Sequence, residues 1–327
     1  MSDTIRWGIL GTGRIAKQFA RGLKTAKGAE LKAVGSRTQQ AADAFGDAFQ
    51  VPRRHAGYDA LANDDEVDAI YVATPHSCHK ENSVLCLKAG KAVLCEKPLA
   101  INAAQAQEMV DVARAENRFL MEAMWTRFIP LIVKAREMIE DGAIGEVRML
   151  SADFGFRAGW DPKNRLLDPE FGGGALLDVG VYNVSLASMI LGPPVGVATL
   201  AHLGETGVDE QAAMVLSYDE GRLAILYTAV RTTTPHEAVI MGTEGWIRIH
   251  APYWKATKMT LWRSREDEEL IEIPFEGNGY NYEAEEVMTC LREGRLESDG
   301  MTLDESLAIM HTMDRIRAEW GLKYPME

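Results

Sequence analysis

The sequence has few cysteines and an excess of acidic over basic residues. Cys78, Cys86, Cys95 and Cys290 include no Cys-x-x-Cys pair, which excludes a disulfide scaffold and the common zinc and redox motifs. Lysine and arginine number 35 against 48 aspartate and glutamate residues, so the formal net charge is −13. A chain this acidic is repelled by phosphate backbones and anionic lipids. We therefore expect no nucleic-acid partner and no membrane-surface role.

Long uninterrupted hydrophobic runs are also missing. The most apolar stretch, 174–197, is broken by Asp178, Asn183, Gly192 and the pair Pro193-Pro194, whereas a membrane span needs about 20 mostly apolar residues. Residues 1–10 lack the basic and apolar regions of a signal peptide. We expect a cytoplasmic protein with reduced thiols and no membrane span.

The first third of the sequence alternates short apolar runs with helical patterns. The 327 residues suggest two domains, and this alternation is typical of βαβ units with a doubly wound parallel sheet. We expect a Rossmann domain over residues 1–124. Its expected strands are 5–10, 31–36, 67–74, 91–96 and 119–124, and its expected helices are 14–26, 38–45, 77–89 and 103–116.

The pattern changes after Trp125, where longer strands separated by turn signals predict a large, open, mostly antiparallel sheet. We expect an α+β domain for substrate binding and dimerisation over 125–327, whose last helix, 303–320, can also pack on the first domain. Its expected strands are 147–156, 196–202, 211–218, 222–230, 236–241, 245–250, 259–263 and 269–274, and its other expected helices are 131–139, 175–190 and 281–293.

The segment Gly11-Thr-Gly13-Arg-Ile-Ala16 follows a predicted strand and opens a predicted helix, which is the context of a dinucleotide-binding turn. Gly11 permits the tight turn, Gly13 lets backbone N–H groups approach a pyrophosphate, and the helix N-terminus attracts the phosphates. The alternative is a structural turn without a ligand.

The second strand ends in Ser36-Arg37-Thr38, where an NAD enzyme usually has a carboxylate for the ribose hydroxyls. A guanidinium and two hydroxyls suit a 2′-phosphate instead, so the sequence favours NADP over NAD. The alternative is that Arg37 is a solvated loop residue.

Two further segments carry candidate catalytic residues. Lys97 follows the strand 91–96, so it lies at the sheet edge where ligands bind in open α/β folds. Asp178 and Tyr182 are four residues apart and share a face if their segment is helical. A tyrosine near positive charge can transfer a proton, although a buried tyrosine paired with a carboxylate explains the same spacing.

His76 and His79 are three residues apart after the strand 67–74, but nothing in the sequence completes a metal site with them. We expect them to pack near the cofactor, and we expect no metal. Trp125, Phe154 and Trp254 are aromatic candidates for the substrate cleft, although most aromatic residues fill cores.

Four motifs together resemble the glucose-fructose oxidoreductase, inositol dehydrogenase and MocA family over nearly the whole chain. They are Gly11-x-Gly13-x-x-Ala16, Ala73-Thr-Pro75 with His79, Glu96-Lys97-Pro98 and Asp178-x-Gly-x-Tyr182. Within that family, segments 121–128 and 172–178 are most similar to the branch of dimeric dihydrodiol dehydrogenases and NADP-dependent D-xylose dehydrogenases. Tyr182 stands where many relatives have histidine, which also favours this branch.

The resemblance implies roles for particular residues. Lys97 and Tyr182 would be the catalytic pair, Asp178 would help to hold the substrate, and the Lys97-Pro98 bond can be cis. The implied cofactor-binding residues are Gly11, Thr12, Gly13, Arg14, Ile15, Ser36, Arg37, Thr38, Thr74, Pro75, His76, His79, Glu96 and Lys97. The implied substrate-binding residues are Trp125, Arg127, Phe154, Asp178, Tyr182 and Trp254.

These inferences predict a homodimeric NADP(H)-dependent oxidoreductase that moves a hydride between nicotinamide and a hydroxyl-bearing carbon of a small sugar or cyclic diol. A keto-sugar reductase and an inositol-type dehydrogenase are the enzyme alternatives. A dinucleotide-binding regulator without turnover is the alternative from another class, and the presence of both Lys97 and Tyr182 argues against it.

Overall fold

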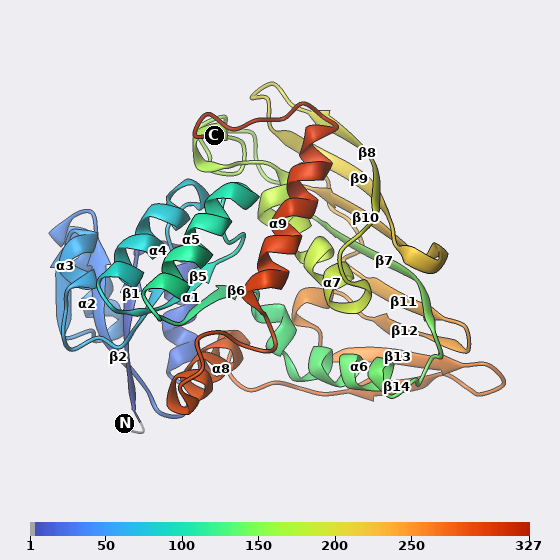
Figure 1. Cartoon of the computed structure of the whole chain (residues 1–327), viewed down its shortest axis with the longest axis horizontal. Coiled ribbons are helices and arrows are strands. Elements are labelled where there is room, and N and C mark those ends of the chain that lie inside the picture. Colours follow the sequence, from blue (N-terminus) through green and yellow to red (C-terminus); the bar gives the residue numbers. More distant parts are fainter. Residues whose placement is uncertain (1–3) are drawn as a thin grey trace. The chain divides into compact units, whose positions relative to one another are not determined.

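A computed structural model describes residues 4–327, which form two compact units (Figure 1). Unit 1 combines the described residues up to Phe128 with Glu276–Leu307, and unit 2 combines Ile129–Phe275 with Ala308–Glu327. The segment 276–307 therefore belongs with the N-terminal residues. The predicted domains, 1–124 and 125–327, placed this segment in the second domain. Helix α9 (Leu303–Ala318) begins in unit 1 and continues in unit 2.

Unit 1 is built on a six-stranded parallel sheet with the strand order β3-β2-β1-β4-β5-β6. The strands are β1 (Ile5–Leu10), β2 (Ala29–Ser36), β3 (Arg53–Ala56), β4 (Ala69–Val72), β5 (Ala92–Glu96) and β6 (Leu120–Ala123). The helices are α1 (Arg14–Leu23), α2 (Gln39–Phe49), α3 (Tyr58–Ala62), α4 (His79–Lys88), α5 (Ala103–Ala115) and α8 (Tyr280–Glu293), with short turns η1 (His76–Cys78) and η2 (Trp125–Phe128).

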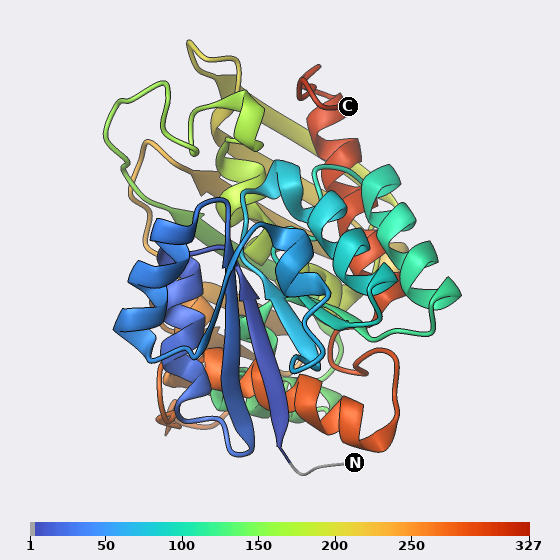
Figure 2. The same cartoon turned by 90° about the vertical axis from the view of Figure 1, so that its left-hand side faces the viewer.

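Helices cover both faces of this sheet, which explains why its central strands are apolar without alternation. On one face Trp7 of β1 contacts Phe19 of α1, whose ring stacks on Tyr71 of β4. On the other face a side chain at Gly8 would meet Leu61 of α3. Figure 2 shows α8, in orange, lying along the sheet, where it packs against α1 and β2.

Unit 2 contains an eight-stranded sheet with the order β14-β13-β12-β11-β7-β10-β9-β8. Neighbouring strands are antiparallel except for β7 and β10. The strands are β7 (Val147–Gly155), β8 (Gly196–Leu203), β9 (Asp209–Ser217), β10 (Leu223–Ala229), β11 (Ala238–Gly242), β12 (Gly245–Ile249), β13 (Lys258–Arg263) and β14 (Glu269–Glu272). The other elements are α6 (Pro130–Glu140), η3 (Pro169–Phe171), η4 (Leu176–Gly180), α7 (Val181–Leu191), η5 (Asp219–Gly221) and η6 (Tyr253–Lys255).

One face of this second sheet is covered and the other is exposed. Helix α7 packs on β7 and β10, and the inward side chains of β9 and β10 are buried. On the outer face, Leu200 is 82% exposed, and Val215, Ile225 and Tyr227 are between 38% and 41% exposed. These four residues lie on the three adjacent strands β8, β9 and β10, so they form an exposed apolar surface.

The expected fold class is confirmed: a doubly wound parallel sheet and a second, mostly antiparallel sheet. The sequence did not indicate β3 and α3, because the polar strand segment Arg53–Ala56 lies at the sheet edge and shows no apolar alternation. The expected helix 175–190 begins as a π-helix, η4, before it continues as α7.

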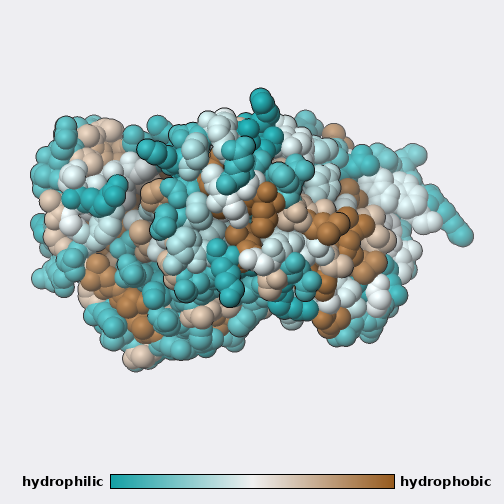
Figure 3. Space-filling model, turned by 90° about the horizontal axis from the view of Figure 1, so that it is seen from above, coloured by the Kyte–Doolittle hydropathy of each residue, from teal (hydrophilic) through white to brown (hydrophobic). Residues whose placement is uncertain are grey.

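Apolar side chains are mostly inside the protein, and this holds for the apolar segment 169–191 as well. The face in Figure 3 is mostly hydrophilic, with apolar side chains in separate patches. Pro169–Leu191 has the length and composition of a membrane-spanning helix, but 83% of its apolar window is buried inside the structure. Burial within the protein accounts for its apolar character.

Candidate active site

The turn between β1 and α1 leaves space beside its backbone. Gly11 has φ +110°, and a Cβ there would lie 2.7 Å from the Ala73 carbonyl oxygen, so only glycine fits. A Cβ on Gly13 would meet nothing within 4 Å, and no side chain caps the α1 helix at Gly13. The first N–H groups of α1 are therefore available to a phosphate, and the turn fits a dinucleotide.

The end of β2 presents a cation beside hydroxyl groups and no carboxylate. Ser36 is buried, and its hydroxyl oxygen lies 3.4 Å from that of Thr12. Arg37 is exposed and has no hydrogen bond or ion pair within residues 4–327. The Thr38 hydroxyl accepts a hydrogen bond from the Ala41 N–H at 3.3 Å, so it caps α2. Arg37 is thus the charged group of this edge that remains available to a ligand.

His79 links the ends of β4 and β5. Its Nδ1 atom lies 2.8 Å from the Pro98 carbonyl oxygen, and its Nε2 atom lies 2.9 Å from the Thr74 carbonyl oxygen. The ring is fully buried, and this burial lowers its pKa to about 4. A neutral imidazole carries one N–H, so His79 donates a hydrogen bond to one of these carbonyls while its other nitrogen faces the second. Both ring nitrogens therefore lie against the backbone.

Three other predicted residues of this edge lie close to His79. The Thr74 hydroxyl accepts a hydrogen bond from Asn82 at 3.0 Å, and Pro75 is exposed before η1. His76 is buried, with its ring centroid 5.7 Å from that of His79. Among residues 4–327, no three His, Cys, Asp or Glu side chains are grouped as metal ligands.

Lys97 lies in a turn that two buried carboxylic residues hold. The Lys97-Pro98 peptide bond is cis. The Lys97 N–H donates to Glu96 Oε2 at 3.2 Å, and the Tyr71 hydroxyl donates to Glu96 Oε1. The Leu99 N–H donates to Glu122 Oε1 at 3.0 Å. Lys97 itself is half-buried and directly follows β5.

Sequence reasoning did not assign a role to Glu122. It is fully buried in β6, and burial raises its pKa to about 7. A signal for it does exist, because a single carboxylic residue interrupts the apolar run 119–124. Such a residue in a buried strand needs a polar partner, which the Leu99 N–H supplies.

Trp125 and Arg127 were predicted to contact substrate, and the structure shows them in other contacts. The Trp125 ring stacks on Tyr280, with centroids 4.5 Å apart. Arg127 is buried, and its Nη1 and Nη2 atoms lie 2.7 and 2.6 Å from the two carboxylate oxygens of Glu305. This bidentate pair occupies the guanidinium group, so the contacts of Arg127 lend no support to a substrate role.

In unit 2, Asp178 lies on η4 and Tyr182 follows on α7, so one continuous helical segment carries both. Asp178 Oδ1 lies 2.8 Å from Nη1 of Arg165, which belongs to the preceding loop and is 55% exposed along its side chain. Sequence reasoning missed Arg165, because the intervening 12 residues show no periodicity that would place it near Asp178.

The Tyr182 ring contacts a cluster of aromatic side chains through Phe154. The Phe154 centroid lies 5.3 Å from that of Tyr182, and Phe154 stacks on Trp254 at 3.5 Å with an interplanar angle of 6°. The His236 ring packs edge-on against Trp254 at 4.8 Å. The backbone N–H of His236, at φ +70°, donates to Asp153 Oδ2 at 2.7 Å. The structure therefore groups the predicted residues Phe154, Tyr182 and Trp254 with His236.

The residue after Tyr182 ties α7 to the sheet. Asn183 donates to the Tyr227 carbonyl oxygen at 2.9 Å and accepts from the Tyr253 hydroxyl at 2.5 Å. Tyr253 is fully buried, and burial together with the nearby Tyr182 holds the pKa of Tyr253 well above its usual value. These contacts fix the backbone beside Tyr182.

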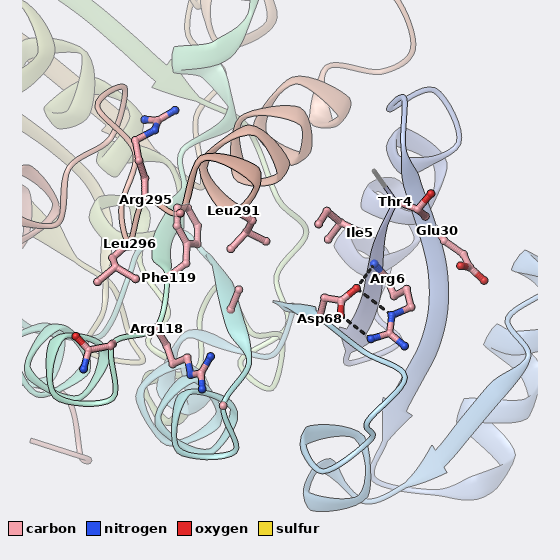
Figure 4. A pocket seen from close by; sticks show the side chains of 14 residues that line it. Thr4, Ile5, Arg6, Glu30, Asp68, Arg118, Phe119, Leu291, Arg295 and Leu296 are labelled. Carbon is pink, nitrogen blue, oxygen red and sulfur yellow. Dashed lines mark hydrogen bonds and ion pairs between the residues drawn. The ribbon is translucent and has the colours of Figure 1, made fainter. Parts of the chain in front are cut away.

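A cavity of about 610 Å³ lies at the opposite edge of the parallel sheet (Figure 4). It is lined where β1, β4, β5 and β6 begin, by residues that include Ile5, Asp68, Ala92 and Phe119. The nearby Arg6 guanidinium is paired with Asp68, with its Nη2 atom 2.7 Å from Oδ1 (Figure 4). Cofactors bind at the carboxyl ends of strands in such sheets, so this cavity is separate from the candidate active site.

The fold and these residues define a dinucleotide-binding domain joined to an open-sheet domain, as in many oxidoreductases. Residues 5–124 match the model of the oxidoreductase family with an NAD-binding Rossmann fold, and residues 132–248 match the GFO/IDH/MocA C-terminal domain. The chain belongs to the GFO/IDH/MocA oxidoreductase family.

Known proteins of this family align over nearly the whole chain. The trans-1,2-dihydrobenzene-1,2-diol dehydrogenase of Xenopus tropicalis is 37% identical over 98% of this chain and 99% of its own length. The human enzyme of the same name is 34% identical over 99% of each chain.

Solved structures show the same architecture. A 3-ketoreductase from Actinomadura kijaniata, in complex with NADP and TDP-benzene, has a TM-score of 0.86 at 26% identity over 96% of this chain and 97% of its own. An aldose-aldose oxidoreductase from Caulobacter crescentus has a TM-score of 0.88 at 25% identity over 98% of both chains.

Proposed function

We propose that this protein is an NADP(H)-dependent dehydrogenase acting on a hydroxyl-bearing carbon of a sugar or cyclic diol, of the D-xylose or trans-dihydrodiol type. One observation carries the proposal: Lys97 lies at the carboxyl edge of the dinucleotide-binding sheet, in a turn held by Glu96, Glu122 and His79. The dihydrodiol dehydrogenases that align over nearly the whole chain support the substrate class.

The proposed chemistry divides between this chain's residues and the cofactor. The turn between β1 and α1 and the Arg37 guanidinium would hold NADP, which when bound would supply the hydride acceptor. Tyr182, as phenolate, takes the hydroxyl proton, and the Lys97 ammonium stabilises the negative charge that develops on the oxygen. Asp178, held by Arg165, hydrogen-bonds a substrate hydroxyl, and Phe154 and Trp254 contact the apolar face of the substrate ring.

We propose that NADP is preferred over NAD. The exposed Arg37 guanidinium suits the 2′-phosphate, and residues 35–38 contain no carboxylate that would bind the ribose hydroxyls. The Actinomadura kijaniata structure contains NADP, which supports this cofactor for the fold.

We further propose a cytoplasmic homodimer that binds neither nucleic acid nor membranes. The exposed apolar surface of Leu200, Val215, Ile225 and Tyr227 supports an association of two copies through the outer sheet face. The formal net charge of −13 opposes binding to phosphate backbones and anionic lipids.

A second enzyme function is reduction of a keto sugar, which the 3-ketoreductase at TM-score 0.86 supports. The two directions use the same residues, because Tyr182 then donates the proton that it takes in the oxidation. A test reaction in both directions separates them.

The test is an absorbance assay of NADP reduction with pentoses, hexoses, inositols and trans-dihydrodiols, and of NADPH oxidation with keto sugars. We expect NADP reduction with D-xylose or a trans-dihydrodiol and slower turnover with NAD. Oxidation of NADPH by keto sugars alone would support the reductase. Tight NADP binding without turnover on any of these compounds would support a dinucleotide-binding regulator.

A further inference from the structure

The turn before the Asp178–Tyr182 segment is enclosed by side chains from distant parts of unit 2. Gly174 has φ +112°, and a Cβ there would collide with Oδ1 of Asp209. The Gly174 N–H donates to the Leu166 carbonyl oxygen at 2.9 Å, next to Arg165. Gly173 and Gly174 therefore lie in a close backbone approach, and at Gly174 only glycine satisfies both the space and the φ angle.

Asp209 reaches this turn from β9. Its Oδ2 atom accepts a hydrogen bond from the Leu176 N–H at 2.7 Å, at the start of η4. The side chain is fully buried, and Oδ1 has no hydrogen-bond partner among the described residues. Burial raises the pKa of Asp209 to about 7. A carboxyl group at this position satisfies an N–H that the helical segment leaves without a backbone partner.

Tyr324 reaches the same turn from the C-terminal tail. Its hydroxyl donates to the Gly173 carbonyl oxygen at 2.8 Å, and its ring is buried. The tail is fixed in turn, because Arg317 forms a bidentate pair with Glu327, whose Oε2 atom also accepts from the Tyr324 N–H at 2.8 Å. Burial raises the pKa of Tyr324 well above its usual value, and the nearby Asp209 carboxylate is the second cause of this rise.

We propose that Asp209 and Tyr324 are positioning residues that clamp the turn 173–176 and thereby place Asp178 and Tyr182 for the reaction. The clamp holds two neighbouring groups, the Gly173 carbonyl and the Leu176 N–H, and Asp178 follows only two residues later. It also fixes Arg165, since the loop carrying this residue is bonded to Gly174. The inference rests on the proposed roles of Asp178 and Tyr182.

A purely structural role predicts a different result from a positioning role. If Asp209 only stabilised the fold, its loss would lower the melting temperature and leave kcat unchanged well below that temperature. If it positions Tyr182, its loss also lowers kcat, because a displacement of about 1 Å at the reacting groups costs about a hundredfold in rate.

The experiment compares Asp209→Ala, Asp209→Asn and Tyr324→Phe with the control Asp219→Ala, which removes an exposed carboxylate from the η5 turn. We expect Asp209→Ala to lose about a hundredfold in kcat with an unchanged Kd for NADP. Asp209→Asn keeps an oxygen acceptor for the Leu176 N–H and should recover most of this loss. Tyr324→Phe, which removes one hydrogen bond, should lose about tenfold.

Hydrogen exchange at the Leu176 amide supplies a second readout that does not depend on turnover. We expect faster exchange of this amide in Asp209→Ala than in Asp209→Asn or the control. Unchanged exchange, or wild-type kcat in both Asp209→Ala and Tyr324→Phe, overturns the inference. If Asp209→Ala does not fold, kcat of Tyr324→Phe decides. Full turnover in Tyr182→Phe would instead overturn the proposed function, and the exchange measurement still tests the clamp.

Discussion

Nη1 of Arg165 lies 2.8 Å from Oδ1 of Asp178, so a half-exposed loop residue holds the buried carboxylate that follows the glycine turn. This contact joins the loop before η4 to the segment that carries Tyr182. The pair orients Asp178, while the exposure of Arg165 limits its contribution to stability.

We predict that Arg165→Ala raises the KM for the sugar or diol about tenfold, because Asp178 loses the charge-assisted hydrogen bond that orients it. The Kd for NADP and the melting temperature should change little. Arg263→Ala removes an exposed ion pair with Glu266 and serves as the control. An unchanged KM in Arg165→Ala would show that the pair does not orient Asp178 toward substrate.

We predict that Tyr182→Phe and Lys97→Ala each lower kcat by about 10²–10⁴ while NADP affinity is retained, as expected for loss of acid–base catalysis. The double variant should be little worse than either single one, because residues that act as a unit are not additive. Steady-state kinetics and NADP titration measure both quantities. The control is Tyr282→Phe on α8, which removes a hydroxyl that accepts from the Glu276 N–H.

The same catalytic assignment predicts that the oxidation rate of the wild type rises with pH to a plateau, as the phenol loses its proton. A kcat near the wild-type value in Tyr182→Phe would contradict the assignment. The same rise of the oxidation rate with pH in this variant as in the wild type would also contradict it. His79 is a poor replacement base, since both of its ring nitrogens face backbone carbonyls.

We predict that Arg37→Ala weakens NADP use about ten- to a hundredfold, because it removes a charge-assisted contact with the 2′-phosphate, and that NAD use changes little. The values of kcat/KM for both cofactors check this. Arg118→Ala, an exposed arginine of the cavity at the opposite sheet edge, is the matched control. Equal losses with both cofactors, or a wild-type preference for NAD, would contradict the NADP assignment.

We predict that Glu122→Gln flattens the pH dependence of the free energy of unfolding. The folded pKa of about 7 lies above the ordinary value of 4.5, so the folded state binds this proton more tightly than the unfolded state. The stability from this proton is present below pH 4.5 and is lost as the pH rises through 7.

The free energy of unfolding that Glu122 contributes should fall by about 3 kcal/mol across this pH range, since each pKa unit corresponds to about 1.4 kcal/mol. Urea unfolding between pH 4.5 and 8 measures it. Asp209 titrates with the same sign, so a residual slope should remain in Glu122→Gln. The control, Glu108→Gln, replaces an exposed carboxylate and should keep the wild-type dependence of unfolding free energy on pH. The same dependence in Glu122→Gln as in the wild type would contradict the prediction.

We predict a dimer in solution that buries about 1,200–2,000 Å² or more through the outer face of the second sheet. Leu200→Asp places a charge on the most exposed apolar side chain of that face and should shift the light-scattering mass toward the monomer. Asp219→Ala should not change it. A monomeric mass for the wild type at micromolar concentration would contradict the proposal.

Much of the fold could be predicted from the sequence because the deciding patterns are local. Nearly continuous apolar runs such as 67–74 predicted buried parallel strands, and β4 is buried throughout. Gly11 and Gly13 could be assigned because a turn between strand and helix needs only neighbouring residues. β3 could not be assigned, because its sequence Arg-Arg-His-Ala at the sheet edge has no apolar alternation.

The sequence by itself determined the two fold types, the dinucleotide-binding turn and the positions of Lys97, Asp178 and Tyr182 on their elements. Only the tertiary structure decided what supports them. His79 is bonded to Pro98, Glu122 to Leu99, Asp209 to Leu176 and Tyr324 to Gly173, across separations of 19 to 151 residues. A hydrogen bond depends on distance in space, and residues so far apart in sequence meet only after the sheets have assembled.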